Sequence, residues 1–152
     1  MKQQHTDILI IGIGLAGMTA AITAAKSGKK ITLITKTENM SSGNTPWAQG
    51  GIVYQGLNDS PEKLKRDILE AGAGHCWEEA VDHLCEHGPK LVKDILIDTL
   101  NVQFDKQQET ETLKRVSEGA HSDARVIYHQ DKIGQSIHAA ALDYLNTLDN
   151  VE

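Results

Sequence analysis

The sequence predicts an α/β fold that opens with a βαβ unit and continues with helical segments. The apolar run at residues 7–11 is typical of a strand buried on both faces of a parallel sheet. Residues 18–27 are rich in alanine, the best helix former, and Gly28 follows them as a C-terminal cap. A second apolar run, residues 31–35, predicts a strand parallel to the first, since the helix supplies the crossover connection.

The rest of the chain is expected to hold one long loop followed by helices and short strands. Residues 36–51 show neither helical nor strand period, and a loop of that length is usually functional or disordered. Asp59 and Ser60 can cap a helix that has Pro61 in its first turn and runs to about Ala71. The later expected elements are a helix at residues 77–99 with a break or kink at Gly88-Pro89, short strands at 101–104 and 113–116, a helix at 131–148, and the entrance to a third parallel strand at 150–152.

Composition and charge exclude several classes of protein. The chain has 152 residues, the length of one ordinary domain, and 39% of them are hydrophobic. Its 15 Lys and Arg residues against 21 Asp and Glu give a net charge of −6, which argues against nucleic-acid or anionic-membrane partners. Residues 1–7 lack an apolar signal region, and 2 cysteines fit a reducing compartment. The sequence therefore predicts a soluble, cytoplasmic protein.

A glycine motif stands between the first predicted strand and helix. Gly12, Gly14 and Gly17 have the spacing of a dinucleotide-binding turn, and the flanking strand and helix are the context that this motif requires. The first glycine permits the tight turn, the second lets the backbone approach a pyrophosphate, and the third allows close packing of helix on strand. The helix N-terminus then offers unpaired N–H groups and partial positive charge to the phosphates.

The residues after the second strand leave the identity of the dinucleotide open. Thr35 occupies the usual position of an acid that binds a ribose hydroxyl, and Lys36 follows it. This pattern fits either NADP, whose 2′-phosphate a cation accommodates, or FAD. In the following loop, Gly50 and Gly51 let backbone amides approach a flat ring, and polar side chains nearby can bind ring heteroatoms or phosphates. The alternative interpretation of this loop is a solvated turn.

Several motifs together resemble the succinate dehydrogenase and fumarate reductase flavoprotein superfamily. They are the glycine motif, Thr35-Lys36 and the segment Ala48-Gln49-Gly50-Gly51-Ile52. Within this superfamily, the chain resembles the L-aspartate oxidase family. The motifs that carry this closer resemblance are Ala71-Gly72-Ala73-Gly74 and Ser117-Glu118-Gly119-Ala120-His121-Ser122, followed by Arg125, Asp131 and Gly134. The resemblance covers essentially the whole chain.

The resemblance implies a partial Rossmann-type FAD-binding domain from an enzyme that oxidises L-aspartate to iminosuccinate. Oxygen or fumarate accepts the electrons, and the product enters NAD biosynthesis through quinolinate synthase. By resemblance, Lys36 contacts the adenosine side of FAD, and Glu118 orients the substrate amino group. The implied cofactor-binding residues are Gly12, Ile13, Gly14, Leu15, Ala16, Gly17, Lys36, Asn44, Thr45, Pro46, Trp47, Ala48, Gln49, Gly50 and Gly51.

Three departures from the family pattern shape the expectation. Membrane-bound relatives carry, at the position of Asn44, a histidine joined covalently to the flavin; asparagine implies non-covalent FAD. Tyr128 stands where a family histidine is expected. The family continues with a capping domain and a helical C-terminal domain, which hold the catalytic arginine and the substrate-binding histidines. Residues 1–152 are thus expected to be the N-terminal portion of an FAD-binding domain, with no catalytic residue of its own and no turnover alone.

Other functions remain as alternatives. A fumarate reductase-like or succinate dehydrogenase-like fragment would act on an unaminated dicarboxylate, and a small module could bind a nucleotide without catalysis. Cys76, His83 and His87 would share one helix face if that helix began early enough, which suggests a zinc site, although closely spaced ligand pairs are lacking. A hydrolase based on His121-Ser122 is disfavoured, because no nucleophile-elbow motif surrounds the serine.

Overall fold

The computed structural model describes residues 5–38 and 40–152, and the chain divides into two compact units. Unit 1 comprises Met1–Gln49 and Gly134–Glu152, and unit 2 comprises Gly50–Ile133. The expectation that residues 1–7 lack a signal region rests partly on residues 1–4, which lie outside the described residues. None of the helices in the described ranges has the length and apolar character needed to cross a membrane.

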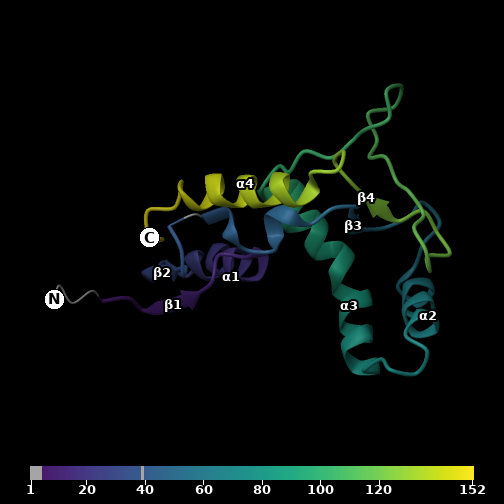
Figure 1. Cartoon of the computed structure of the whole chain (residues 1–152), viewed down its shortest axis with the longest axis horizontal. Helices are drawn as coiled ribbons and strands as arrows, with labels where there is room; N and C mark the ends of the chain where they lie inside the picture. Colours follow the sequence, from purple (N-terminus) through teal and green to yellow (C-terminus); the bar gives the residue numbers. More distant parts are fainter. Residues whose placement is uncertain (1–4, 39) are drawn as a thin grey trace. The chain divides into compact units, whose positions relative to one another are not determined.

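Unit 1 begins with the predicted βαβ arrangement. Strand β1, Ile8–Ile11, pairs in parallel with β2, Ile31–Ile34, and helix α1, Leu15–Ala25, connects them (Figure 1). Helix α1 packs against both strands through its buried residues Met18, Ala21 and Ile22. The prediction of this unit is confirmed, although the helix begins three residues earlier than expected because the glycine turn leads directly into it.

The end of the chain returns to the same sheet. Helix α4, Ile133–Leu145, is shorter than the expected helix at 131–148. Val151 then forms a parallel bridge with Ile31, and the Leu33 N–H donates to the Glu152 carbonyl at 2.7 Å. The expected entrance to a third parallel strand is therefore confirmed.

The long loop of unit 1 contains local structure that the sequence pattern did not predict. Two short 3₁₀ turns occur in it, η1 at Met40–Ser42 and η2 at Thr45–Trp47. Pro46 lies in the first turn of η2, where its missing N–H costs no hydrogen bond. A single 3₁₀ turn is too short to produce a period in the sequence.

Unit 2 combines a two-stranded antiparallel pair with two helices. Strand β3, Ile52–Val53, pairs with β4, Val126–Ile127. These strands were not predicted, because two residues carry no alternating pattern. Helix α2, Pro61–Ala71, was predicted correctly, and its cap is the Ser60 hydroxyl, which accepts the Lys63 N–H at 3.3 Å.

Helix α3, Glu78–Leu91, runs through Pro89 and continues into the π-helical segment η3, Val92–Thr99. A break at Gly88-Pro89, one of the two outcomes expected there, is therefore wrong, and a kink at this position stays a prediction. Proline lacks the N–H that would close an ordinary helical turn, and the following segment has lengthened hydrogen-bonded turns instead. At its end, the Leu100 N–H donates to the Ile95 carbonyl at 2.8 Å, five residues back.

The expected strands at residues 101–104 and 113–116 are also wrong. Residues 101–104 form no strand, and the second segment makes only isolated bridges, Lys106 with Leu113 and Val116 with Val126. Val102 and Phe104 are buried. Their apolar character thus reflects burial in the core of the unit, not a hydrogen-bonded ladder.

Candidate functional site

The glycine turn of unit 1 brings the end of β1 against the start of α1. Gly12 has a φ of +109°, a conformation that strongly favours glycine. A Cβ on Gly17 would overlap the carbonyl oxygen of Gly12, so only glycine allows the helix to cross the strand this closely. Gly14 is the extended N-cap residue, and its carbonyl accepts the Met18 N–H at 3.0 Å.

The N-terminus of α1 is chemically suited to a phosphate. Helix α1 has no acidic residue in its first turn, and its N-cap residue, Gly14, has no side chain that could accept a hydrogen bond from the first-turn N–H groups. The Leu15 N–H donates to the Thr45 hydroxyl at 3.0 Å, so the long loop brings a polar side chain to this helix end. Backbone N–H groups, a hydroxyl and the positive end of a helix dipole are a donor set that fits a pyrophosphate.

The 44–48 turn is fixed from two sides within unit 1. The Asn44 carbonyl accepts the Trp47 N–H at 3.1 Å, and Pro46 is buried. At the start of α4, the Gly134 N–H donates to the Ala48 carbonyl at 3.1 Å. A Cβ on Gly134 would lie 2.7 Å from that same oxygen, so the glycine allows α4 to reach the turn. The turn is therefore supported by its own hydrogen bond and by the start of α4.

The other sequence-predicted residues of unit 1 lie at its surface or close to it. Trp47 is 73% exposed, and Lys36 and Gln49 are also exposed. Ile13 is half-buried, and Ala16 is exposed on the first turn of α1. Among these residues, the structure brings Gly14, Leu15 and Thr45 into direct proximity.

Unit 2 brings together the remaining predicted residues. Gly50 has a φ of +82°, and a Cβ on it would lie 3.4 Å from a carboxylate oxygen of Glu118. A Cβ on Gly51 would overlap Val126 and lie 2.7 Å from the Ile127 carbonyl oxygen. Gly51 therefore packs tightly on β4, and the exposed backbone of Gly50 lies beside the Glu118 carboxylate.

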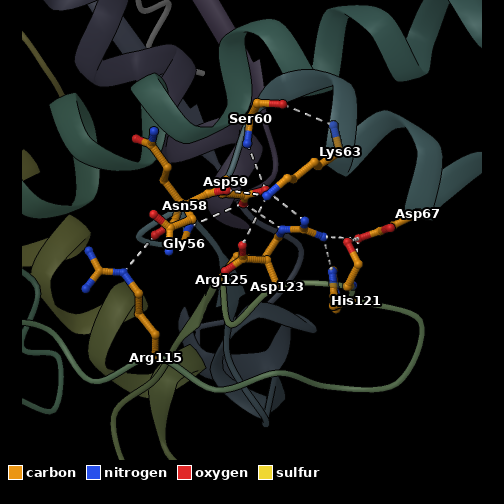
Figure 2. Close-up of polar contacts among 12 residues, drawn as sticks. Gly56, Asn58, Asp59, Ser60, Lys63, Asp67, Arg115, His121, Asp123 and Arg125 are labelled. Carbon is orange, nitrogen blue, oxygen red and sulfur yellow. Dashed lines mark hydrogen bonds and ion pairs between the residues drawn. The ribbon is translucent and has the colours of Figure 1, made fainter.

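A buried ionic cluster lies beneath the segment that carries Glu118. Arg125 is fully buried and forms two hydrogen bonds with Asp59, from Nε at 2.7 Å and from Nη2 at 2.8 Å. Figure 2 shows Asp59 on one side of the guanidinium and Asp67 with His121 on the other. The Nη1 atom donates to Asp67 at 2.6 Å and to His121 Nδ1 at 2.9 Å. Because a guanidinium only donates, His121 Nδ1 is the acceptor in this bond.

Hydrogen bonding keeps the carboxylates of this cluster ionised. The Ser122 backbone N–H, with the Arg125 guanidinium, holds the pKa of Asp67 well below its usual range. Burial raises the pKa of Asp59, but hydrogen bonds from Arg125, Gly56 and Ser60 lower it more. In the described part of the chain, no buried side-chain nitrogen or oxygen lacks a hydrogen-bond partner.

Asp59 and Asp67 are not among the residues that the sequence predicts for the site. A signal for Asp67 was nonetheless present in the pattern. Asp67 follows buried Leu64 by three residues and precedes half-buried Ile68, so it lies on the inward face of an amphipathic helix. An acid at such a position requires a partner, and the fold supplies Arg125 from 58 residues away.

The zinc and hydrolase interpretations find no support in the geometry. Cys76 precedes α3, and its thiol contacts the Ile68 carbonyl at 3.5 Å, so it does not share a helix face with His83 and His87. No group of three or more potential metal ligands occurs within residues 5–38 and 40–152. The Ser122 hydroxyl donates to Asp67 at 2.8 Å and is thus not oriented toward His121 as a nucleophile would be.

Comparison with known proteins resolves the dinucleotide. A family described as an FAD binding domain matches residues 7–152. The chain belongs to this FAD binding domain family. FAD is thus the cofactor of the family, and the NADP alternative is set aside.

Individual relatives of this FAD binding domain are L-aspartate oxidases. The enzyme from Halobacterium salinarum is 40% identical over 147 residues, which cover 97% of this chain and 28% of that protein. The enzyme from Synechocystis is 34% identical over 153 residues, covering 100% of this chain and 27% of the relative. The chain therefore spans 27–28% of the length of these two curated relatives.

Solved structures show the same fold. The Mycobacterium smegmatis Sdh1 complex matches 100% of this chain and 28% of its own chain, with a TM-score of 0.89 at 20% identity. The Escherichia coli quinol fumarate reductase FrdA matches 100% of this chain and 26% of its own, with a TM-score of 0.88 at 24% identity. The expected partial Rossmann-type FAD-binding fold is thereby confirmed.

Proposed function

We propose that this chain is the N-terminal FAD-binding part of an L-aspartate oxidase, which oxidises L-aspartate to iminosuccinate with oxygen or fumarate as acceptor. Relatives of that name align over essentially the whole chain. The observation that carries the proposal is the Glu118 carboxylate beside Gly50, because a carboxylate at the glycine pair can bind an ammonium group. Succinate has no such group to offer, so Glu118 favours an amino-acid substrate over an unaminated dicarboxylate.

In this proposal, different residues of the chain bind different parts of FAD. The N-terminus of α1 and the Thr45 hydroxyl bind the FAD pyrophosphate, Lys36 contacts the adenosine side, and the segment 44–51 contacts the pyrophosphate and the flavin. FAD supplies an acceptor for the hydride that leaves the substrate carbon. Asn44 cannot form the covalent link that a histidine makes, so the cofactor is held non-covalently. Residues 1–152 thus form the N-terminal portion of an FAD-binding domain and supply no catalytic residue.

The proposed reaction also indicates which enzyme would use the product. Iminosuccinate is the product that quinolinate synthase consumes in NAD biosynthesis, so that enzyme is the proposed functional neighbour. The proposed location is the cytoplasm. Neither nucleic acid nor a membrane is a proposed partner, in line with the net charge of −6.

A fusion enzyme tests this function. Residues 1–152 are joined to the segment of the Halobacterium salinarum L-aspartate oxidase that follows its matched region. We expect this fusion enzyme to release peroxide in the presence of L-aspartate and oxygen, whereas the 152-residue chain alone shows no turnover. Glu118→Gln should raise the KM for L-aspartate on the order of tenfold or more, because a hydrogen bond to a charged group contributes about 1.5–3 kcal/mol.

The controls separate the proposal from its alternatives. Asp98→Asn changes an exposed carboxylate whose partner is Lys93, and it should leave turnover unchanged. Acid precipitation should release the flavin into the supernatant, and flavin retained in the pellet would contradict non-covalent binding. A fusion enzyme that oxidises succinate and not L-aspartate would identify the fumarate reductase-like alternative and refute the proposal.

A further inference from the structure

We propose that Asp67, a buried residue of α2, is a positioning residue for Glu118 and therefore for recognition of the substrate ammonium group. This inference rests on the proposed function of Glu118. Asp67 contacts neither substrate nor cofactor in the proposal, and it acts through the 117–122 segment. The relevant groups all belong to unit 2.

One oxygen of Asp67 holds the far end of the segment that carries Glu118. Asp67 Oδ2 accepts both the backbone N–H and the hydroxyl of Ser122, each at 2.8 Å. The same oxygen accepts Arg125 Nη1 at 2.6 Å. The Asp67 side chain is only 5% exposed, so water cannot substitute for these donors. Ser122 is consequently fixed relative to the rigid helix α2.

Short bonds within the segment transmit this position to Glu118. The His121 N–H donates to the Glu118 carbonyl at 3.1 Å, and the Ser117 hydroxyl donates to the His121 carbonyl at 3.1 Å. His121 is also held by Arg125 Nη1 through its ring nitrogen. Ala120 adopts a positive φ of 68°, which such a tight turn requires and a free chain would rarely populate. Glu118 is therefore attached to a turn that is closed on one side by its own bonds and anchored on the other by Asp67.

The base of the same segment is closed by strand-like pairing. Val116 and Val126 exchange backbone hydrogen bonds at 2.9 and 3.1 Å, so the nine intervening positions form a closed loop. Glu118 and its neighbours at residues 117–120 are exposed, so their own side chains do not anchor the loop in the core. Asp67 is thus a contact from outside the loop that fixes Ser122. Lys63 of α2 also pairs with Asp123 of the loop at 3.8 Å, and Asp59 holds Arg125.

The test compares Asp67→Ala, Asp67→Asn and Asp98→Asn in the fusion enzyme. Asp67→Ala removes the oxygen that accepts both the backbone N–H and the hydroxyl of Ser122. It should raise the KM for L-aspartate on the order of tenfold to a hundredfold, since small misplacements have effects of that size. The inhibition constant of succinate and the affinity for FAD should not change, because neither depends on Glu118. Asp67→Asn retains an oxygen acceptor and should recover part of the loss, and Asp98→Asn should match the parent.

A double-mutant cycle distinguishes positioning from a general structural role. If Asp67 acts through Glu118, Asp67→Ala should add little to the KM of a Glu118→Gln fusion enzyme. Additive effects, or an equal loss of succinate binding, would overturn the inference.

Hydrogen exchange on the 152-residue chain separates failure of this inference from failure of the proposed function. Asp67→Ala should increase exchange of peptides covering residues 117–122 and leave those of α1 unchanged. Unchanged exchange at residues 117–122 would overturn the positioning role whatever the fusion enzyme does. A parent fusion enzyme without aspartate oxidation would instead count against the proposed function.

Discussion

Gly17→Ala should destabilise unit 1 by about 2–3 kcal/mol, the upper part of the usual range for overpacking. The added Cβ would overlap the Gly12 carbonyl oxygen, a backbone atom that cannot move without displacing the end of β1. Loss of this crossing also displaces the N-terminus of α1 from Thr45. Urea unfolding monitored by circular dichroism measures the loss, and a titration with FAD measures its consequence for binding.

The matched control makes the same substitution inside another helix. At Gly88 in α3, an added Cβ would meet only Leu84 Cδ1 at 3.6 Å, an ordinary contact. Gly88→Ala should therefore be neutral or stabilising by up to about 1 kcal/mol, because alanine is the better helix former. Equal effects of Gly17→Ala and Gly88→Ala would show that the close strand–helix crossing is not what Gly17 provides.

Arg125→Met should cost about 3–5 kcal/mol at neutral pH, the usual effect of removing one partner from a buried ion pair. Arg125 is fully buried, and the variant leaves Asp59 and Asp67 without their cation. Arg66→Met removes an exposed arginine from α2 and should change stability by no more than about 0.5 kcal/mol. Urea unfolding of both variants beside the parent checks these values.

The effect of Arg125→Met should also depend on pH in a defined direction. In the parent, the pKa values of Asp59 and Asp67 lie below those of the unfolded chain. The contribution of these two carboxylates to the free energy of unfolding is therefore present above about pH 4 and is lost as the pH falls further. In the variant, burial without a cation favours the neutral carboxyls. The difference in unfolding free energy between parent and variant should thus shrink as the pH falls from about 7 to 4. A constant difference would mean that Arg125 acts through packing alone.

The fold was predictable where many neighbouring residues repeat one signal. Residues 7–35 combine an apolar strand, a glycine turn, an alanine-rich helix and a second strand, and each local signal agrees with the next. Ser60 and Pro61 similarly predicted the start of α2. Short elements escaped prediction: β3 and β4 have two residues each, and their pairing joins segments more than seventy positions apart. The continuation through Pro89 depended on a change in helical hydrogen bonding that no sequence period signals.

The candidate site was likewise predictable where its residues are contiguous and not where they are far apart in the sequence. The glycine motif and the 44–51 segment are contiguous, and their residue types carry their chemistry. The contacts between Thr45 and Leu15, and between Asp67 and Ser122, join residues 30 and 55 positions apart. Only the folded chain brings them together. The buried position of Asp67 indicated that it needs a partner, but the pattern alone could not identify Arg125.

Titration with FAD tests the central claim that a pyrophosphate binds at the N-terminus of α1. The parent fusion enzyme should quench flavin fluorescence on binding and should melt at a higher temperature with FAD than without it. Gly14→Ala adds a Cβ that meets only Thr45 Oγ1, at 3.6 Å, so the variant should fold as the parent does. It should bind FAD at least about tenfold more weakly, because the added methyl group lies where the backbone approaches the phosphate. No change in fluorescence or melting of the parent, or an unaltered FAD affinity in Gly14→Ala, would contradict the account.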